Sequence, residues 1–123
     1  MVDTSVVAVV RCRSYEKNEV RQAVKRGIAL LGGTTKFAKE KERILFKPNV
    51  LWPTNPAKCV ITHPIILWAI ADVLKDTGAQ LSYGDSSAGF NKSEAAMRRC
   101  GYEKLLQPLG VKLQLFGKSE LKA

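Results

Sequence analysis

The sequence predicts an α/β fold: a three-layer sandwich with a mainly parallel sheet of about four strands between helices. Short β-branched or aliphatic runs alternate along the chain with longer segments of helical periodicity. That alternation is typical of parallel strands joined by right-handed crossovers. The chain has 123 residues, of which 46% are hydrophobic and 25% charged, as in soluble globular proteins. We therefore expect residues 1–123 to form a single α/β domain.

Four segments are predicted as strands. Ser5–Cys12 is a nearly continuous β-branched run, typical of a strand buried on both faces. Arg43–Phe46 ends at Lys47-Pro48-Asn49, because proline cannot donate to a ladder. Ala79–Tyr83 follows, and Val111–Phe116 alternates strictly, which indicates an edge strand with one side in water. A Rossmann-like arrangement, such as the flavodoxin-like order 2-1-3-4, would place the first strand centrally and the fourth at an edge.

Helical signals fill the intervening segments. Glu16–Leu31 carries apolar residues at helical spacing and stops at Gly32-Gly33. Pro64–Thr77 is apolar almost all round, and Thr62 or His63 can cap it while proline suits its first turn. The remaining predicted helical segments are Asn91–Gly101, which opens with a capping-box variant, and Tyr102–Leu109.

The charge balance is basic, with 20 Lys and Arg against 11 Asp and Glu and a formal net charge of +9. The basic residues are spread along the chain, and the densest run, Lys36–Arg43, alternates with glutamates as a solvated surface segment does. We therefore do not expect nucleic acid as a partner. The charge favours solubility or the attraction of small anions.

Other features indicate the compartment. The longest apolar stretch, Pro64–Ala71, is far shorter than the ~20 residues of a spanning helix. The first residues carry no secretion signal, and the three cysteines are widely spaced, which favours reduced thiols. We expect a cytoplasmic protein with no membrane partner.

Polar residues gather where two predicted strands end, and in open α/β sheets ligands bind outside the carboxyl ends of the strands. After the second strand, Lys47 can pair with a phosphate or carboxylate while Asn49 orients it by hydrogen bonding. Both residues have a plainer interpretation, as a solvated lysine and a turn residue that bonds its own backbone. The ligand-binding candidates are Lys47, Asn49, Thr62, Ser86 and Ser87.

The Gly84–Gly89 loop follows the third strand. Its serines supply hydroxyls and N–H groups, and the helix that begins near Asn91 adds the positive end of its dipole, so an anion can rest there. Asp85 can orient Lys47, take a substrate proton if burial raises its pKa, or hold a cation. The plainer interpretation is that Asp85 and Ser87 satisfy turn amides.

His63 is the chain's single histidine and precedes a helix. A neutral imidazole there can polarise a carbonyl, or it can simply cap the helix. Asp85 and His63 are therefore the catalytic candidates. Cys59 lies four residues before His63, but one loop supplies only two ligands, so we predict no metal site.

The order and spacing of four short motifs resemble a known family. They are Lys47-Pro48-Asn49, Thr62-His63-Pro64, Lys75-Asp76-Thr77-Gly78-Ala79 and Gly84-Asp85-Ser86. Over Val6–Tyr102 the chain resembles the uncharacterised, iron–sulfur-associated family named domain of unknown function 362. The resemblance implies a longer domain, so that this chain is its N-terminal part or a shortened relative, and a ferredoxin-like [4Fe–4S] module in many members. The chain has no Cys-x-x-Cys-x-x-Cys cluster, so we expect no cofactor on its own residues.

Together these features favour an enzyme or enzyme fragment that binds a small anionic ligand at the loops after the second and third predicted strands. Iron–sulfur redox metabolism is the setting that the resemblance implies. The alternative is a non-catalytic scaffold or interaction domain that works beside a ferredoxin-like partner. We also expect a homodimer through the Val111–Phe116 edge strand, unless a longer chain covers that edge.

Overall fold

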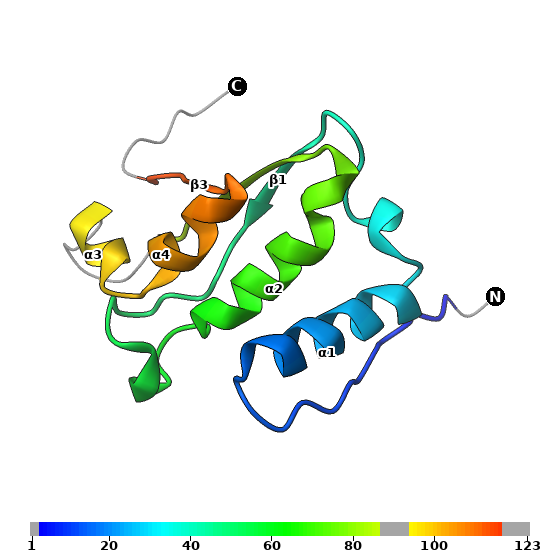
Figure 1. The fold of residues 1–123 in the computed structure, drawn as a ribbon, viewed down its shortest axis with the longest axis horizontal. Helices are drawn as coiled ribbons and strands as arrows, with labels where there is room; N and C mark the ends of the chain where they lie inside the picture. Colours follow the sequence, from blue (N-terminus) through cyan, green and yellow to red (C-terminus); the bar gives the residue numbers. More distant parts are fainter. Residues whose placement is uncertain (1–2, 87–93, 117–123) are drawn as a thin grey trace.

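The computed structural model describes residues 3–86 and 94–116 and has mixed α/β structure (Figure 1). Its helices and strands are, in order, α1 (Lys17–Leu30), β1 (Arg43–Phe46), α2 (Pro64–Leu74), β2 (Gln80–Tyr83), α3 (Glu94–Arg98), α4 (Tyr102–Leu106) and β3 (Lys112–Leu113). Short 3-10 turns lie between them, two of which extend α2 and α4. The α/β class expected from the sequence is therefore confirmed.

The strands form one parallel sheet of three strands in the order β1-β2-β3. Arg43 of β1 pairs with Gln80 of β2, and Ser82 of β2 pairs with Lys112 of β3. Two expectations were wrong for the part of the chain that the structure describes. The sheet has three strands rather than four. The flavodoxin-like order required another strand between β1 and β2, but these two pair directly with each other.

The missing strand is the Ser5–Cys12 segment, which forms no regular secondary structure. It runs alongside α1, where Val10 lies near Gly27, while Val9 on the opposite side is 89% exposed (Figure 1). A β-branched run favours extended backbone, but a strand also needs a neighbour to accept and donate its hydrogen bonds. No described strand offers that neighbour to this segment.

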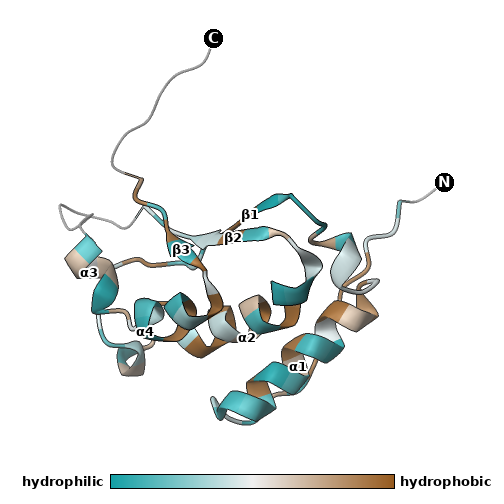
Figure 2. Cartoon of the chain, turned by 45° about the horizontal axis from the view of Figure 1, so that its top comes forward, coloured by the Kyte–Doolittle hydropathy of each residue, from teal (hydrophilic) through white to brown (hydrophobic). Residues whose placement is uncertain are grey.

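Three of the described helices lie on one side of the sheet. Figure 2 shows α1, α2 and α4 together below the strands. Leu81 and Tyr83 of β2 are buried, whereas Gln80 and Ser82 alternate with them and are more accessible. In the described residues the architecture thus has two layers, sheet and helices, rather than the three that the sequence predicted.

Local signals explain the two long helices. Glu16 caps α1 by accepting hydrogen bonds from the backbone N–H groups of Asn18 and Glu19. His63 caps α2, whose first residue is Pro64, and the following 3-10 turn ends at Gly78 in the left-handed region with φ of 79°. Both helices were predicted within a few residues.

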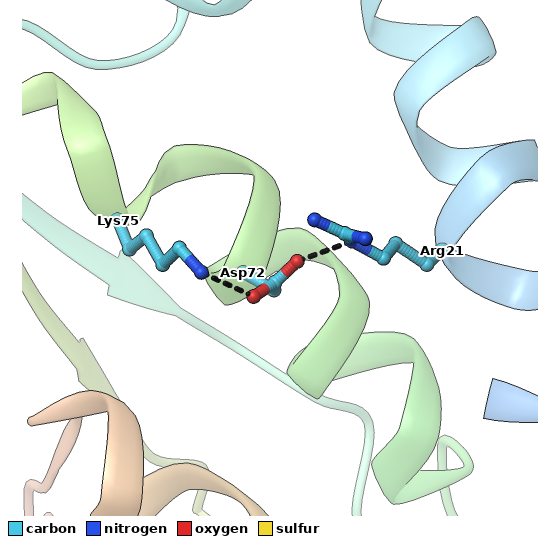
Figure 3. A network of polar contacts seen from close by, with 3 residues as sticks. All are labelled: Arg21, Asp72 and Lys75. Carbon is cyan, nitrogen blue, oxygen red and sulfur yellow. Dashed lines mark hydrogen bonds and ion pairs between the residues drawn. The ribbon is translucent and has the colours of Figure 1, made fainter. Parts of the chain in front are cut away.

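Asp72 of α2 forms an ion pair with Arg21 of α1. It is buried on α2 and accepts hydrogen bonds from Nε of Arg21 on α1 and from Nζ of Lys75, the latter at 2.8 Å (Figure 3). A carboxylate on a buried position of an apolar helix needs such partners, because removing its hydration is costly. Asp72 was not among the residues predicted from the sequence.

Residues 111–116, which were predicted to form an edge strand, form a shorter strand. Val111 is buried, as expected for the inner side of an edge strand, and Leu113 is partly buried. Regular pairing, however, stops at Leu113, and Leu115 is 53% exposed rather than in the core. Beyond β3, the Gln114 N–H still donates to the Tyr83 carbonyl at 2.8 Å, and the Gln114 carbonyl and the Phe116 ring lie close to Gly84.

Candidate functional site

The loops after β1 and β2 meet through an ion pair. Nζ of Lys47 lies 2.8 Å from Oδ1 of Asp85, and the second carboxylate oxygen, Oδ2, accepts the backbone N–H of Val50 at 2.7 Å. The Asp85 side chain is 6% exposed, whereas that of Lys47 is 60% exposed. The carboxylate of the ion pair is therefore buried, and the side chain of Lys47 is exposed to solvent.

The Asp85 carboxylate is held in its charged form. Burial on its own would raise its pKa, but hydrogen bonds from Lys47 and from the N–H groups of Val50 and Ser86 lower the pKa below the ordinary value. A carboxylate with a lowered pKa is a weak proton acceptor. The geometry therefore favours the orienting role of Asp85 over its role as a general base.

Asn49 and Thr62 connect the two ends of the same loop. Oδ1 of Asn49 accepts from Nζ of Lys47 at 3.3 Å, and its backbone N–H donates to the Thr62 hydroxyl at 3.1 Å. The hydroxyl of the buried Tyr102 donates to the Thr62 carbonyl at 2.7 Å. Burial raises the pKa of Tyr102, which keeps the phenol protonated as this donor. The hydroxyl of Thr62 is therefore engaged in closing the loop.

His63 follows Thr62 and serves as the cap of α2. Its Nδ1 accepts the backbone N–H of Ile65 at 3.3 Å, so the proton of the neutral ring lies on Nε2. Tyr15 stacks on the imidazole, with ring centroids 4.0 Å apart and planes inclined by 12°. Burial lowers the pKa of His63, which favours the neutral ring. Nothing in the sequence around Tyr15 pointed to this contact.

Not all sequence candidates can be placed. Lys47, Asn49, Thr62 and Asp85 form one connected group, and Ser86 joins it through its backbone. Ser87 and the expected helix start at Asn91 lie outside the described residues. The partners Val50 and Tyr102 were not predicted, because a backbone N–H and a tyrosine far along the chain leave no local signal.

Gly84 has a packing reason for being glycine. A Cβ atom at this position would lie 2.4 Å from the carbonyl oxygen of Gln114, and close to the Phe116 ring. The chain that follows β3 therefore packs directly against the backbone at Gly84.

The cysteines do not fit an iron–sulfur cluster. Clusters of this kind are held by four ligands, mostly thiolates, and the chain has three cysteines. Cys12 and Cys59 are exposed in separate segments, and Cys100 is buried beyond α3. Within residues 3–86 and 94–116, no three His, Cys, Asp or Glu side chains gather as metal ligands.

Two hollows lie away from this group. One, of about 940 Å³, borders the sheet and is lined in part by Arg43, Gln80, Ser82 and Lys112. A second, of about 380 Å³, lies between α1 and α2 near Asp72. Neither hollow includes Lys47 or Asp85. The candidate site is nevertheless the Lys47–Asp85 pair, because a buried carboxylate beside an exposed ammonium is the more specific chemistry.

No described helix is long and apolar enough to cross a membrane.

Comparison with known proteins gives one family and one curated relative. The family model described as Domain of unknown function (DUF362) matches residues 44–122. A "Thylakoid-associated protein" of Synechocystis is 32% identical over 110 residues, which are 89% of this chain and 34% of the relative. The chain thus spans about a third of the length of that relative. No solved structure matches the chain.

Proposed function

Since the chain belongs to the DUF362 family, we propose that it binds a small anionic ligand at the loops after β1 and β2, as an enzyme or enzyme fragment. Residues 44–122, which match the family model, include all of the site residues that gather around Asp85. The cytoplasm is the compartment that we propose for this activity.

The Lys47–Asp85 ion pair is the observation that supports the proposal. Asp85 and Asn49 each take one hydrogen bond from the ammonium group, which has three donors. The third donor is left for a ligand at the exposed end of the side chain. Ser86, exposed next to Asp85, adds a hydroxyl to the same region. A phosphate or carboxylate is the ligand class that a charge-assisted bond from lysine suits best.

His63 follows Thr62 of the connected group directly in the chain, and we propose it as the residue that acts on the bound ligand. Its Nε2–H is a neutral donor, because Nδ1 is committed to the helix cap. A neutral imidazole can polarise a carbonyl, as it does in other enzymes that place histidine at a helix N-terminus. In a longer family member such a site would serve redox metabolism beside an iron–sulfur module, which we propose from the resemblance alone.

Calorimetric titration with inorganic phosphate and with acetate at low salt tests the binding. Lys47→Ala is expected to weaken binding by about 1.5–3 kcal/mol, the range for hydrogen bonds to charged groups. Lys39→Ala removes an exposed lysine before β1 and serves as the matched control, with little expected loss. Equal losses of anion affinity in the two variants would mean that diffuse surface charge attracts the anion, and the assignment of the site to Lys47 would be wrong.

A further inference from the structure

The loop between β1 and α2 carries an exposed apolar patch, which we call the 51–60 patch: Leu51, Trp52 and Val60. Leu51 is 67% exposed, Trp52 50% and Val60 38%. Large apolar side chains are ordinary at a surface when they are scattered, but three in one short loop are not scattered. Such a cluster is typical of a surface that meets another apolar phase.

The exposure of this patch follows from how the loop is held. Val50 and Ile61 form an antiparallel bridge, and both side chains are buried in the core. Neighbouring side chains on extended chains point to opposite sides. Leu51 and Val60, each one residue further along the loop, therefore turn outward. The bridge thus accounts for the outward direction of Leu51 and Val60.

Within the loop that carries the patch, the charge is positive. Residues 48–62 contain one lysine, Lys58, and no aspartate or glutamate. Lys58 is exposed, and the whole chain carries a net charge of +9. Tryptophan and leucine are preferred side chains at the boundary between lipid headgroups and acyl chains, and lysines add attraction to anionic lipids.

From this combination we propose that the 51–60 patch inserts into the surface of an anionic lipid bilayer, with Lys58 among the headgroups. A second copy of the chain fits the patch less well, because it would bring two lysine-bearing loops of equal charge together. The absence of a spanning segment, which led us to expect no membrane partner, does not oppose this contact, since peripheral binding needs no spanning helix. None of the three patch side chains takes part in the ion pair or the hydrogen bonds around Asp85, so either proposal can fail alone.

Cosedimentation with vesicles tests this proposal directly. The vesicles are pure phosphatidylcholine or phosphatidylcholine mixed with an equal amount of phosphatidylglycerol. We expect binding to the mixed vesicles only. Leu51→Ser and Trp52→Ser are each expected to weaken it by about tenfold, since each removes a large apolar side chain that would leave water. Leu30→Ser is the matched control, because Leu30 is 52% exposed on α1, and it should bind as the unaltered protein does.

A second measurement reports on insertion itself. The chain has two tryptophans, so Trp68→Phe leaves Trp52 as the only one. Its emission should shift to the blue with mixed vesicles and stay unchanged with soluble glycerol phosphate, which separates a bilayer from a free headgroup. Lys47→Ala should retain vesicle binding even where it loses phosphate. No binding to mixed vesicles by folded protein, or equal losses in Leu51→Ser and Leu30→Ser, would overturn the proposal and leave a protein partner as the occupant.

Discussion

Asp85 joins the ends of two neighbouring parallel strands through Lys47, with 2.8 Å between Oδ1 and Nζ. Its other oxygen holds the backbone N–H of Val50 at the start of the 50–61 loop. One buried carboxylate therefore positions both the exposed cation of the candidate site and the loop beside it. Replacing this residue should affect stability as well as ligand binding.

Asp85→Ala is expected to lower the free energy of unfolding by about 1–3 kcal/mol, because the N–H of Val50 loses its acceptor. Asp85→Asn should cost less, since an amide oxygen can still accept that bond. Urea unfolding measures both variants, with Asp76→Asn, at an exposed position after α2, as the control. Equal effects of the alanine and asparagine variants would contradict the role given to the Val50 bond.

The same carboxylate should make stability depend on acid pH. The pKa of Asp85 is lowered in the folded protein, so the unfolded chain takes up the proton first as the pH falls below about 3.9. The stabilisation is fully present above that pH and is lost as the pH falls towards the folded pKa. The stability difference between the unaltered protein and Asp85→Asn should therefore shrink in that range. A difference that stays constant at low pH would show that the folded pKa is not lowered.

His63 should titrate below the ordinary value of about 6.5, because burial lowers its pKa. As the pH falls through about 6.5 the unfolded chain is protonated first, so stability decreases until the folded pKa is reached. NMR can follow this single histidine directly. Tyr15→Ala uncovers the ring and should raise its pKa towards 6.5. An unchanged pKa would mean that Tyr15 contributes nothing to the burial.

Asp72→Ala should destabilise the contact between α1 and α2 by about 1–3 kcal/mol, because two cations lose their shared carboxylate at a buried position. The cost stays below that of a fully buried pair, since Arg21 and Lys75 are partly exposed and can hydrate. Arg21→Ala leaves the Lys75 bond in place and should cost less. Thermal unfolding of both variants measures the difference, and a larger loss in Arg21→Ala would contradict the assignment.

β3 should support self-association through its outer edge. Gln114 N–H bonds to Tyr83, so the neighbouring Leu113 turns its own N–H to the outer side. We expect light scattering to detect a dimer at high concentration unless further polypeptide covers this edge. Leu113→Pro removes the outward donor and should give a monomer. A strict monomer in the unaltered protein would count against the edge contact.

The sequence by itself determined those features of this protein that depend on residues close together in the chain. The capping residues Glu16 and His63, the proline that opens α2 and the glycine that closes it act within one or two turns. The paired polar loops after β1 and β2 were also predictable, because parallel strands bring their carboxyl ends to one edge of a sheet.

Only the tertiary structure decided which groups are partners. Ser5–Cys12 has the composition of a strand, yet it remains unpaired in the described residues, because the ladder bonds of a strand must come from another segment. The contacts of Tyr15 with His63 and of Tyr102 with Thr62 likewise join residues far apart in the chain. The lowered pKa of Asp85 depends on Lys47 and Val50, which approach it only when the sheet forms. The local sequence determines helix caps and hydrophobic periodicity. The contact partners of a side chain and its protonation state depend on distances between residues that only the folded chain brings together.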